Sequence, residues 1–198
     1  MTRTFSIDMF SDRIPLWEKT MAPYVGKPSI DYLEVGTYEG RSLCWMLDNV
    51  LTDPSCRAVA IDTWAVQPDW QEHGKEEWEA VWRTMRANVG DDPRVRIAAG
   101  DSAEQLAVEI AQGSQRFDIA YIDGSHRALA CITDMSLAWR LLKVGGAMIV
   151  DDISTWPDPP SWHPSDCPAT AGAAWAARAR IAAPIECGQA VFRKVSDI

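Results

Sequence analysis

Short apolar runs alternate with helix-like segments along almost the whole chain of 198 residues. Five runs have the aliphatic and aromatic content typical of buried strands. They cover residues 32–36, 58–62, 94–100, 117–123 and 147–152. Segments with helical apolar spacing cover residues 41–51, 75–90, 102–113, 128–146 and 170–182. This alternation predicts right-handed βαβ units and a mainly parallel sheet, an α/β fold.

The C-terminal segment breaks the alternation. Residues 184–195 read PIECGQAVFRKV, which predicts a closing antiparallel strand pair. We therefore expect a sheet of seven strands in a single domain over residues 1–198. The amphipathic stretch within residues 1–28 is expected to form an N-terminal helical cap over the sheet or its pocket.

The net charge and the cysteine content limit which binding partners and which cellular compartment are expected. The formal net charge of −9 argues against nucleic acid as the main ligand. No segment approaches the roughly 20 apolar residues needed to cross a bilayer, so no membrane partner is expected. The five cysteines include no CxxC pair, and their odd number argues against a disulfide framework. A cytoplasmic protein with reduced thiols is the simplest interpretation.

Each predicted strand ends in polar residues or glycine. A parallel sheet of this kind binds its ligand at the carboxyl ends of its strands. The segments expected at that edge are residues 34–40, 62–64, 100–102, 123–126 and 151–152. The sequence therefore places five aspartates and a histidine where such a fold has its site.

The first turn, LEVGTYEGRS, indicates which nucleotide binds there. A dinucleotide fingerprint needs a middle glycine for close approach of the pyrophosphate, and Tyr38 occupies that position. Glu34 suits a ligand with an ammonium group instead. S-adenosylmethionine has such a group, and its ribose hydroxyls suit Asp62 at the end of the second strand. Asp101 and Ser102, after the third strand, are placed to meet the adenine edge.

Five stretches carry a resemblance to a known family. They are LEVGTYEGRSLCWML, AIDTW, FDIAYIDGSH, LLKVGGAMIVDDI and GQAVFRK. From about Ile14 to Lys194 the chain resembles class I S-adenosylmethionine-dependent methyltransferases, in particular the methyltransferase domain 24 family and the catechol O-methyltransferase group. The resemblance implies a Rossmann-like, doubly wound, seven-stranded and mostly parallel sheet with a terminal antiparallel hairpin.

The resemblance also implies a set of cofactor-binding positions around the methionine, ribose and adenine parts of the cofactor. These are Glu34, Gly36, Thr37, Tyr38, Gly40, Ser42, Asp62, Thr63, Trp64, Gly100, Asp101, Ser102 and Asp123.

Metal and catalytic roles follow from the same resemblance. In catechol-type enzymes an aspartate after the fourth strand and an Asp-Asn pair after the fifth hold magnesium. Those positions here are Asp123, Asp151 and Asp152, so the second member of the pair is Asp rather than Asn. His126 stands where the catalytic lysine would be, and an imidazole can accept a proton near neutral pH. Three oxygen ligands favour Mg²⁺ or another hard divalent cation.

Structural alternatives stand beside these roles. Asp123 could simply cap the next helix, with no catalytic or metal-binding role. His126 could be an ordinary surface residue in the first turn of that helix. Asp151 and Asp152 could shape the cofactor pocket without binding a metal. Asp134, on the helix after His126, is predicted to be a solvated surface residue.

Two irregular segments, residues 64–74 and 153–169, interrupt the pattern, and the second is a candidate substrate loop. Their aromatic residues are expected either to form a flat floor for a ring-shaped substrate or to anchor the loops. These residues are Trp64, Trp70, Trp156 and Trp162. His73 and His163 lie in the same two segments and could contact substrate, but ordinary surface histidines are the favoured interpretation. The tryptophans on helices are predicted to pack in the core, namely Trp45, Trp82, Trp139 and Trp175.

Together these features predict a methyltransferase that uses S-adenosylmethionine to methylate a small molecule. O-methylation of a sugar, phenol or natural-product hydroxyl is favoured, with a divalent cation, Mg²⁺ first, and His126 as general base. Two alternatives remain open: a metal-independent N-methyltransferase and a non-catalytic cofactor-binding protein. An exposed aromatic surface would favour a homodimer.

Overall fold

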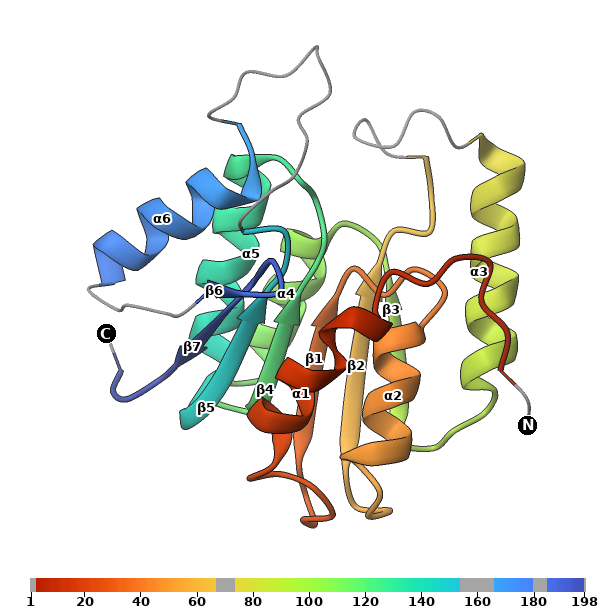
Figure 1. Ribbon diagram of the computed structural model, residues 1–198, viewed down its shortest axis with the longest axis horizontal. Helices are drawn as coiled ribbons and strands as arrows, with labels where there is room; N and C mark the ends of the chain where they lie inside the picture. Colours follow the sequence, from red (N-terminus) through yellow and green to blue (C-terminus); the bar gives the residue numbers. More distant parts are fainter. Residues whose placement is uncertain (1–2, 67–73, 154–165, 180–184, 198) are drawn as a thin grey trace.

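A single twisted sheet forms the centre of the computed structural model, which describes residues 3–66, 74–153, 166–179 and 185–197. Within these residues the sheet has seven strands in the order β3-β2-β1-β4-β5-β7-β6 (Figure 1). Their bounds are β1 (Asp31–Val35), β2 (Arg57–Asp62), β3 (Val95–Ala99), β4 (Phe117–Ile122), β5 (Leu142–Val150), β6 (Ile185–Glu186) and β7 (Gln189–Arg193). Strands β1 to β5 are parallel, and β7 pairs antiparallel with both β5 and β6. The predicted Rossmann-like fold with a terminal hairpin is confirmed.

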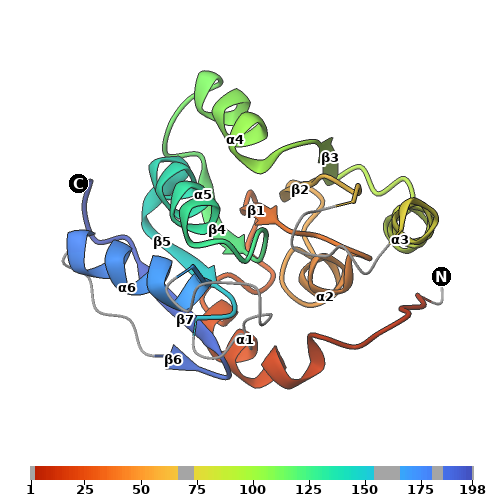
Figure 2. The same cartoon turned by 90° about the horizontal axis from the view of Figure 1, so that it is seen from above.

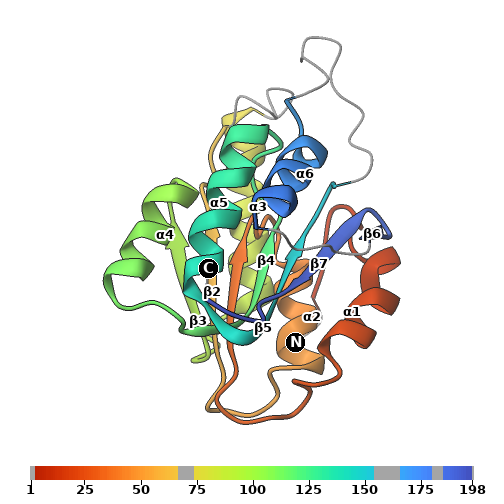
Figure 3. The same cartoon turned by 90° about the vertical axis from the view of Figure 1, so that its left-hand side faces the viewer.

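Helices cover both faces of the sheet. They are the 3₁₀ turn η1 (Ser11–Arg13), α1 (Ile14–Met21), α2 (Arg41–Asn49), α3 (Lys75–Val89), α4 (Ser102–Ala111), α5 (Ala128–Leu141) and α6 (Pro168–Ala179). Seen from above, α1, α2 and α3 lie on one side of the sheet, while α4 and α5 lie on the other (Figure 2). Helix α6 runs beside α5 (Figure 3). Because both faces are covered, the strands are nearly continuous apolar runs.

The core divides into two layers, one on each face of the sheet. In β1, Tyr32 packs into the layer with α1, α2 and α3, whereas Leu33 packs into the layer with α4, α5 and α6. This is the period of two expected of a strand. Trp139 and Trp175 are buried in the second layer, which confirms their predicted packing role. Trp45 and Trp82 pack, partly buried, against the first layer.

The boundary between α5 and β5 differs from the prediction. The helix expected over residues 128–146 ends at Leu141, and Leu142 already begins a nine-residue strand. The buried Lys194 ammonium donates hydrogen bonds to the carbonyls of Trp139 and Leu142, at 3.0 and 2.9 Å, which satisfies the helix end. Gly145 has φ +92° and lies at a register shift between β4 and β5. The glycine pair was predicted to close the helix, but it forms an irregularity within the strand.

Two smaller expectations can be compared with the structure. Within the described residues, no helix is both long and apolar enough to cross a membrane. All five cysteines lie in the described residues and have free thiols.

Candidate active site

The turn after β1 makes close contact with the end of β4. Gly36 has φ +85°, and a Cβ placed on it would lie 1.7 Å from the carbonyl oxygen of Asp123. Only glycine fits at this position, because any side chain would collide with backbone. On its other side, the Gly36 amide donates to the carbonyl of Ile61, at 2.9 Å. The cofactor turn predicted from the sequence and the predicted catalytic Asp123 therefore lie in direct contact.

Glu34 lies fully buried beneath this turn. Its carboxyl group accepts hydrogen bonds from the Tyr32 hydroxyl and from the Ser42 hydroxyl, the latter at 3.1 Å. Burial raises the pKa of Glu34 to about 7, although these donors oppose the shift. Glu34 and Ser42, predicted to surround the methionine part of a cofactor, are thus bonded to each other. Thr37 is also buried, and Gly40, with φ +81°, is the N-cap residue of α2.

Asp62, at the end of β2, is oriented by the backbone. Its two carboxylate oxygens accept hydrogen bonds from the amides of Tyr38 and Trp64, at 2.8 and 2.9 Å. Burial nevertheless raises the pKa of Asp62 above its ordinary value. Each carboxylate oxygen can accept a second hydrogen bond, so the group keeps acceptor capacity for ligand hydroxyls.

The Trp64 side chain packs in the core. Its ring lies 4.8 Å from that of Trp82, and its indole N–H donates to the Tyr38 carbonyl at 2.9 Å. The aromatic-floor hypothesis is therefore wrong for Trp64, which braces the β1–α2 turn, and Thr63 lies beside it. The other parts of that hypothesis lie outside the described residues. These parts are Trp70, His73, Trp156, Trp162, His163 and most of the loop at residues 153–169.

The end of β3 leads into a pocket between α4 and α5. Gly100 has φ +144°, and Asp101 is the N-cap residue of α4, accepting a hydrogen bond from the Glu104 amide at 3.2 Å. A pocket of about 350 Å³ is lined by Asp101, Ser102 and Arg127, with apolar side chains from α5. The structure thus places the predicted adenine-binding pair at the mouth of a cavity.

Asp134 also lines this pocket, which corrects a prediction. It was expected to be solvated, yet its side chain is 1% exposed and accepts a hydrogen bond from the Ser102 hydroxyl at 2.7 Å. Burial raises the pKa of Asp134 to about 7. Helical spacing alone failed because α4 packs over this face of α5 and supplies the hydroxyl partner.

Acidic groups and a histidine meet at the ends of β4 and β5. Atoms able to bind a metal on Asp123, His126 and Asp152 all lie within 4.8 Å of one another. The buried His126 places Nε2 3.1 Å from a carboxylate oxygen of Asp152. Asp152 has φ +56°, a conformation that Asp and Asn adopt more readily than most residues. Asp123 precedes α5 but is not its N-cap residue, since Arg127 occupies that position.

Asp151 is held slightly apart from this group. One of its carboxylate oxygens accepts hydrogen bonds from the Tyr121 hydroxyl at 2.5 Å and from the Gln189 amide at 2.7 Å. The other accepts the Asp152 amide at 2.8 Å. The sequence offered no role for Tyr121 or Gln189. Gln189 in particular is 38 residues from Asp151 in the chain, so no local pattern marks it.

The carboxylates repel one another. Burial, followed by the charges of Asp151 and Asp152, raises the pKa of Asp123 well above its ordinary value. Burial and Asp152 likewise raise the pKa of Asp151. A shared proton or a bound cation would relieve this repulsion. Oxygen-rich and negatively charged, the cluster fits a hard divalent cation.

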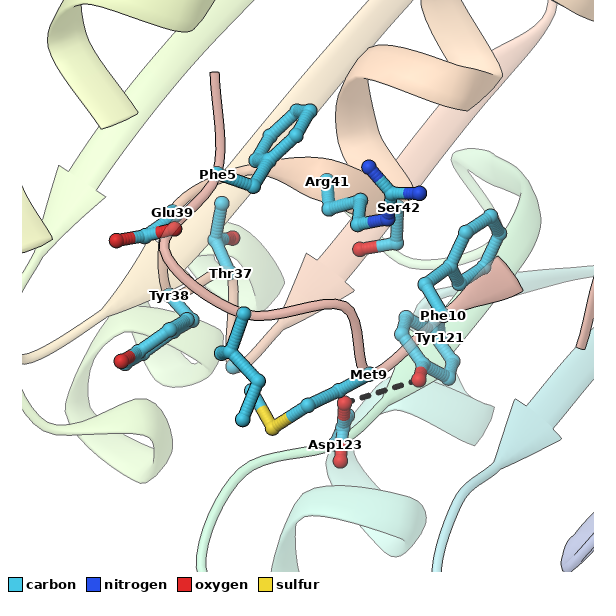
Figure 4. Close-up of a pocket in the computed structure, with 12 residues that line it drawn as sticks. Phe5, Met9, Phe10, Thr37, Tyr38, Glu39, Arg41, Ser42, Tyr121 and Asp123 are labelled. Atoms are coloured by element: carbon cyan, nitrogen blue, oxygen red, sulfur yellow. Dashed lines mark hydrogen bonds between the residues drawn. The ribbon is translucent and has the colours of Figure 1, made fainter. Parts of the chain in front are cut away.

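The N-terminal segment crosses the β1–α2 turn (Figure 4). The Ser6 amide donates to Glu39 at 2.7 Å, and the Arg41 guanidinium donates to Asp8 at 2.8 Å. Phe5, Met9 and Phe10 lie across the turn and leave a cavity of about 50 Å³ that reaches Asp123. The sequence placed these residues only within a general cap, because no motif marks them.

A family model for a methyltransferase domain matches residues 33–153, more than half of the chain. The chain belongs to this methyltransferase domain family. Membership agrees with the resemblance to class I S-adenosylmethionine-dependent methyltransferases stated from the sequence. The matched range runs from β1 to the end of β5 and includes both the glycine turn and the carboxylate cluster.

The relatives and solved structures that match this chain are distant. The uncharacterised protein R132 of Acanthamoeba polyphaga mimivirus is 26% identical over 149 residues, which are 72% of this chain and 58% of that protein. MycE, a methyltransferase of the mycinamycin biosynthetic pathway solved with Mg, S-adenosylhomocysteine and mycinamycin VI, is 17% identical with a TM-score of 0.63. The match covers 95% of this chain but 50% of MycE. The O-methyltransferase NovP is 17% identical, with a TM-score of 0.63 over 93% of this chain and 80% of NovP. At these identities the solved structures show a shared fold.

Proposed function

We propose that this protein is an S-adenosylmethionine-dependent methyltransferase that methylates a hydroxyl group of a small molecule. A divalent cation assists the transfer, and His126 is the general base. One observation carries the proposal. The Gly36 turn packs directly on Asp123, and Asp123, His126 and Asp152 converge within 4.8 Å. A cofactor turn and an acid–base cluster therefore share one edge of the sheet.

The polar groups along this edge suit the parts of the cofactor. When bound, S-adenosylmethionine supplies a methyl group activated by a positively charged sulfonium. Glu34 places a carboxyl group beneath the turn for the ammonium end, and Asp62 has acceptor capacity for ribose hydroxyls. The pocket beside Asp101 and Ser102 has polar rims and apolar walls, which suit a base such as adenine. Its volume of about 350 Å³ lies in the range of small-molecule sites.

The carboxylate cluster suits a cation. Asp123 and Asp152 offer oxygens within reach of a common point, and Asp151 stands beside them as the third predicted ligand. When bound, a divalent cation would lower the pKa of an acceptor hydroxyl and orient it. Mg²⁺ prefers oxygen to nitrogen ligands, so this assignment leaves His126 available for proton transfer.

His126 is placed to take the acceptor proton. Asp152 lies 3.1 Å from its Nε2 and would stabilise the imidazolium that forms. Burial excludes bulk water from the imidazole, which keeps the proton transfer local. Methyl transfer also needs the acceptor oxygen about 3 Å from the methyl carbon and in line with the breaking bond. The contact between Gly36 and Asp123 brings the two halves of that geometry together.

A hydroxyl acceptor is favoured over an amine by the cluster itself. An amine is nucleophilic once neutral and needs no cation, so metal-free N-methylation would make no use of three carboxylates. MycE, solved with Mg, and the O-methyltransferase NovP support the same choice through their shared fold. A non-catalytic cofactor-binding protein would likewise have no need for His126 beside the aspartates.

Calorimetric titration of Mg²⁺ into chelator-treated protein saturated with S-adenosylhomocysteine tests the proposal. We expect one-to-one binding that Asp152→Ala abolishes and His126→Ala retains. Turnover, measured as S-adenosylhomocysteine release with a panel of sugars and phenols, should be lost in both variants. Asp91→Ala, the same change on a fully exposed side chain, is the matched control.

Other outcomes would change the assignment. Loss of Mg²⁺ binding in His126→Ala would make the histidine a ligand instead of the base. Absence of Mg²⁺ binding in the unmodified protein, with S-adenosylhomocysteine still bound, would support the metal-independent N-methyltransferase.

A further inference from the structure

A buried chain of hydrogen bonds connects helix α1 to the ends of β4 and β5. The Trp17 indole N–H donates to the side-chain oxygen of Gln189 at 2.9 Å. The Gln189 amide nitrogen donates to Asp151 at 2.7 Å, and the same carboxylate oxygen accepts the Tyr121 hydroxyl at 2.5 Å. The Tyr121 hydroxyl also lies 2.9 Å from Asp123 (Figure 4). The chain thus ends on two of the proposed cation ligands.

The direction of this chain is fixed by its first member. An indole N–H can only donate, so the oxygen of the Gln189 side chain must face Trp17. The Gln189 amino group must then face Asp151, where it donates to a carboxylate. If the amide were reversed, two donors would meet at Trp17 and two acceptors would meet at Asp151. Trp17 and Gln189 are both fully buried, so water cannot compensate for such a reversal.

Tyr121 fixes the spacing of two carboxylates. Its hydroxyl lies between Asp151 and Asp123, which would otherwise repel one another. The tyrosine ring is itself held by the edge of Trp17, with ring centroids 4.9 Å apart. Neither carboxylate can rotate freely while the hydroxyl remains between them.

The remaining oxygen of Asp151 is also restrained. It accepts the Asp152 amide at 2.8 Å, and the Arg13 guanidinium nitrogen lies 3.8 Å away. Both oxygens of Asp151 therefore have donors, and its orientation is set from two sides. Because Arg13 and Trp17 belong to η1 and α1, the N-terminal helical region contributes to this restraint.

We propose that Tyr121 and Gln189 are positioning residues of the cation site, and that Trp17 sets the orientation of Gln189. They hold Asp151 and Asp123 in the arrangement that accepts the cation, although none of the three contacts the cation itself. The inference rests on the proposed cation-assisted function. Partners of metal ligands in general orient them, and their loss weakens metal affinity by roughly 10- to 100-fold.

Mg²⁺ titration by calorimetry, with S-adenosylhomocysteine at saturation, measures this role directly. Tyr121→Phe and Gln189→Glu should each weaken Mg²⁺ binding by roughly 10- to 100-fold. Trp17→Phe, which keeps an aromatic ring but removes the N–H, should weaken it less. The affinity for S-adenosylhomocysteine should stay within about twofold in all three, because these side chains hydrogen-bond to one another, to Asp151 and to Asp123 rather than to Glu34, Ser42 or Asp62.

Tyr24→Phe is the matched control. Tyr24 is a buried tyrosine whose hydroxyl contacts Arg193 and the Gly145 carbonyl, away from the carboxylate cluster. Its loss should lower the melting temperature without changing Mg²⁺ affinity. Gln189→Leu replaces Gln189→Glu if the new buried charge prevents folding.

The outcomes separate this inference from the proposed function. Mg²⁺ binding that is equal in the unmodified protein and in folded Tyr121→Phe and Gln189 variants would overturn the positioning role alone. Absence of Mg²⁺ binding in the unmodified protein would overturn both the positioning role and the cation-assisted mechanism. Equal loss of affinity in Tyr24→Phe would show a general effect of stability and would also overturn the positioning role.

Discussion

The glycine turn (residues 36–40) and the carboxylate cluster (Asp123, Asp151 and Asp152) lie side by side, but their acidic groups have different surroundings. In the turn, Asp62 and Glu34 accept hydrogen bonds from backbone amides or hydroxyls. In the cluster, Asp123, Asp151 and Asp152 face one another, and burial together with the charges of Asp151 and Asp152 raises the pKa of Asp123. The acids of the turn are therefore fixed by hydrogen bonds, whereas the cluster is under a repulsion that a cation would relieve.

The contact between the two regions should be the most sensitive point. Gly36→Ala combines a clash at 1.7 Å with backbone and a positive φ, so it should destabilise the fold by more than about 4 kcal/mol. Gly145→Ala is the matched control, since Gly145 also has positive φ but has no atom within 4 Å of the added Cβ. It should cost about 1–2 kcal/mol. Urea denaturation of both variants measures the difference, and equal losses would show that the close contact is unimportant.

Neutralising one acid in the cluster should stabilise the protein. Asp123→Asn removes a charge that faces two others, so the melting temperature in chelator should rise by a few degrees, corresponding to about 1 kcal/mol. Turnover should fall at least about 100-fold because a charged ligand of the cation is replaced by a neutral amide. A lower melting temperature for Asp123→Asn would contradict the repulsion inferred from the structure.

The same Asp→Asn substitution in the turn should lower the melting temperature instead of raising it. In Asp62→Asn the amide group can accept only one of the two backbone N–H groups and presents its own N–H to the other. Leaving a buried donor unsatisfied costs about 1–3 kcal/mol, so this variant should melt at a lower temperature. Its affinity for S-adenosylhomocysteine should also fall. If Asp62→Asn and Asp123→Asn shifted the melting temperature in the same direction, the contrast between the regions would fail.

A third acid, Asp134, belongs to neither region and gives a pH-dependent effect. Its pKa is raised from 3.8 to about 7 by burial, and one of its oxygens has no hydrogen-bond partner among the described residues. The folded state therefore binds a proton that the unfolded state releases between these pH values. Its contribution to stability is complete below about pH 4 and falls as the pH rises to about 7, by up to about 1.4 kcal/mol per pH unit.

Asp134→Asn should remove this slope. The difference in unfolding free energy between the variant and the unmodified protein should grow from pH 4 to pH 7 and then stay constant. Denaturant titrations across this range measure it. A difference that does not change with pH would show that Asp134 stays ionised in the folded state.

These comparisons also show what the sequence alone could predict. The strands, the glycine at position 36 and the acids after each strand follow from local patterns, because periodicity and strand ends are encoded within a few residues. The roles implied for Glu34 and Asp62 depend on the same short motifs. The residues that gather at the carboxyl edge of the sheet could therefore be predicted from the sequence, and the ligands proposed for that edge are predictions as well.

Other features depend on contacts between distant segments. Trp17 and Gln189 are 172 residues apart, and only the closing strand β7 brings them together. Asp134 was predicted as solvated because the helical pattern of α5 does not reveal that α4 covers it. The glycine pair at residues 145–146 is typical of a helix end. The helix nevertheless ends earlier, at Leu141, where the buried Lys194 ammonium donates to the carbonyl of Trp139. In each case the residue or helix that determines the structure is too distant in the sequence for a local pattern to reveal it.

The smallest effect on stability should come from the ion pair that fastens the N-terminal segment over the turn. Asp8→Asn keeps an oxygen for the Phe10 and Ser11 amides but removes the charge that faces Arg41. The pair is half exposed, so stability should change by less than about 0.5 kcal/mol. Dissociation of S-adenosylhomocysteine should nevertheless become a few times faster, because the segment covers the cavity beside the turn. Stopped-flow tryptophan fluorescence measures that rate, and an unchanged rate would mean that the turn alone, without the N-terminal segment, retains the ligand.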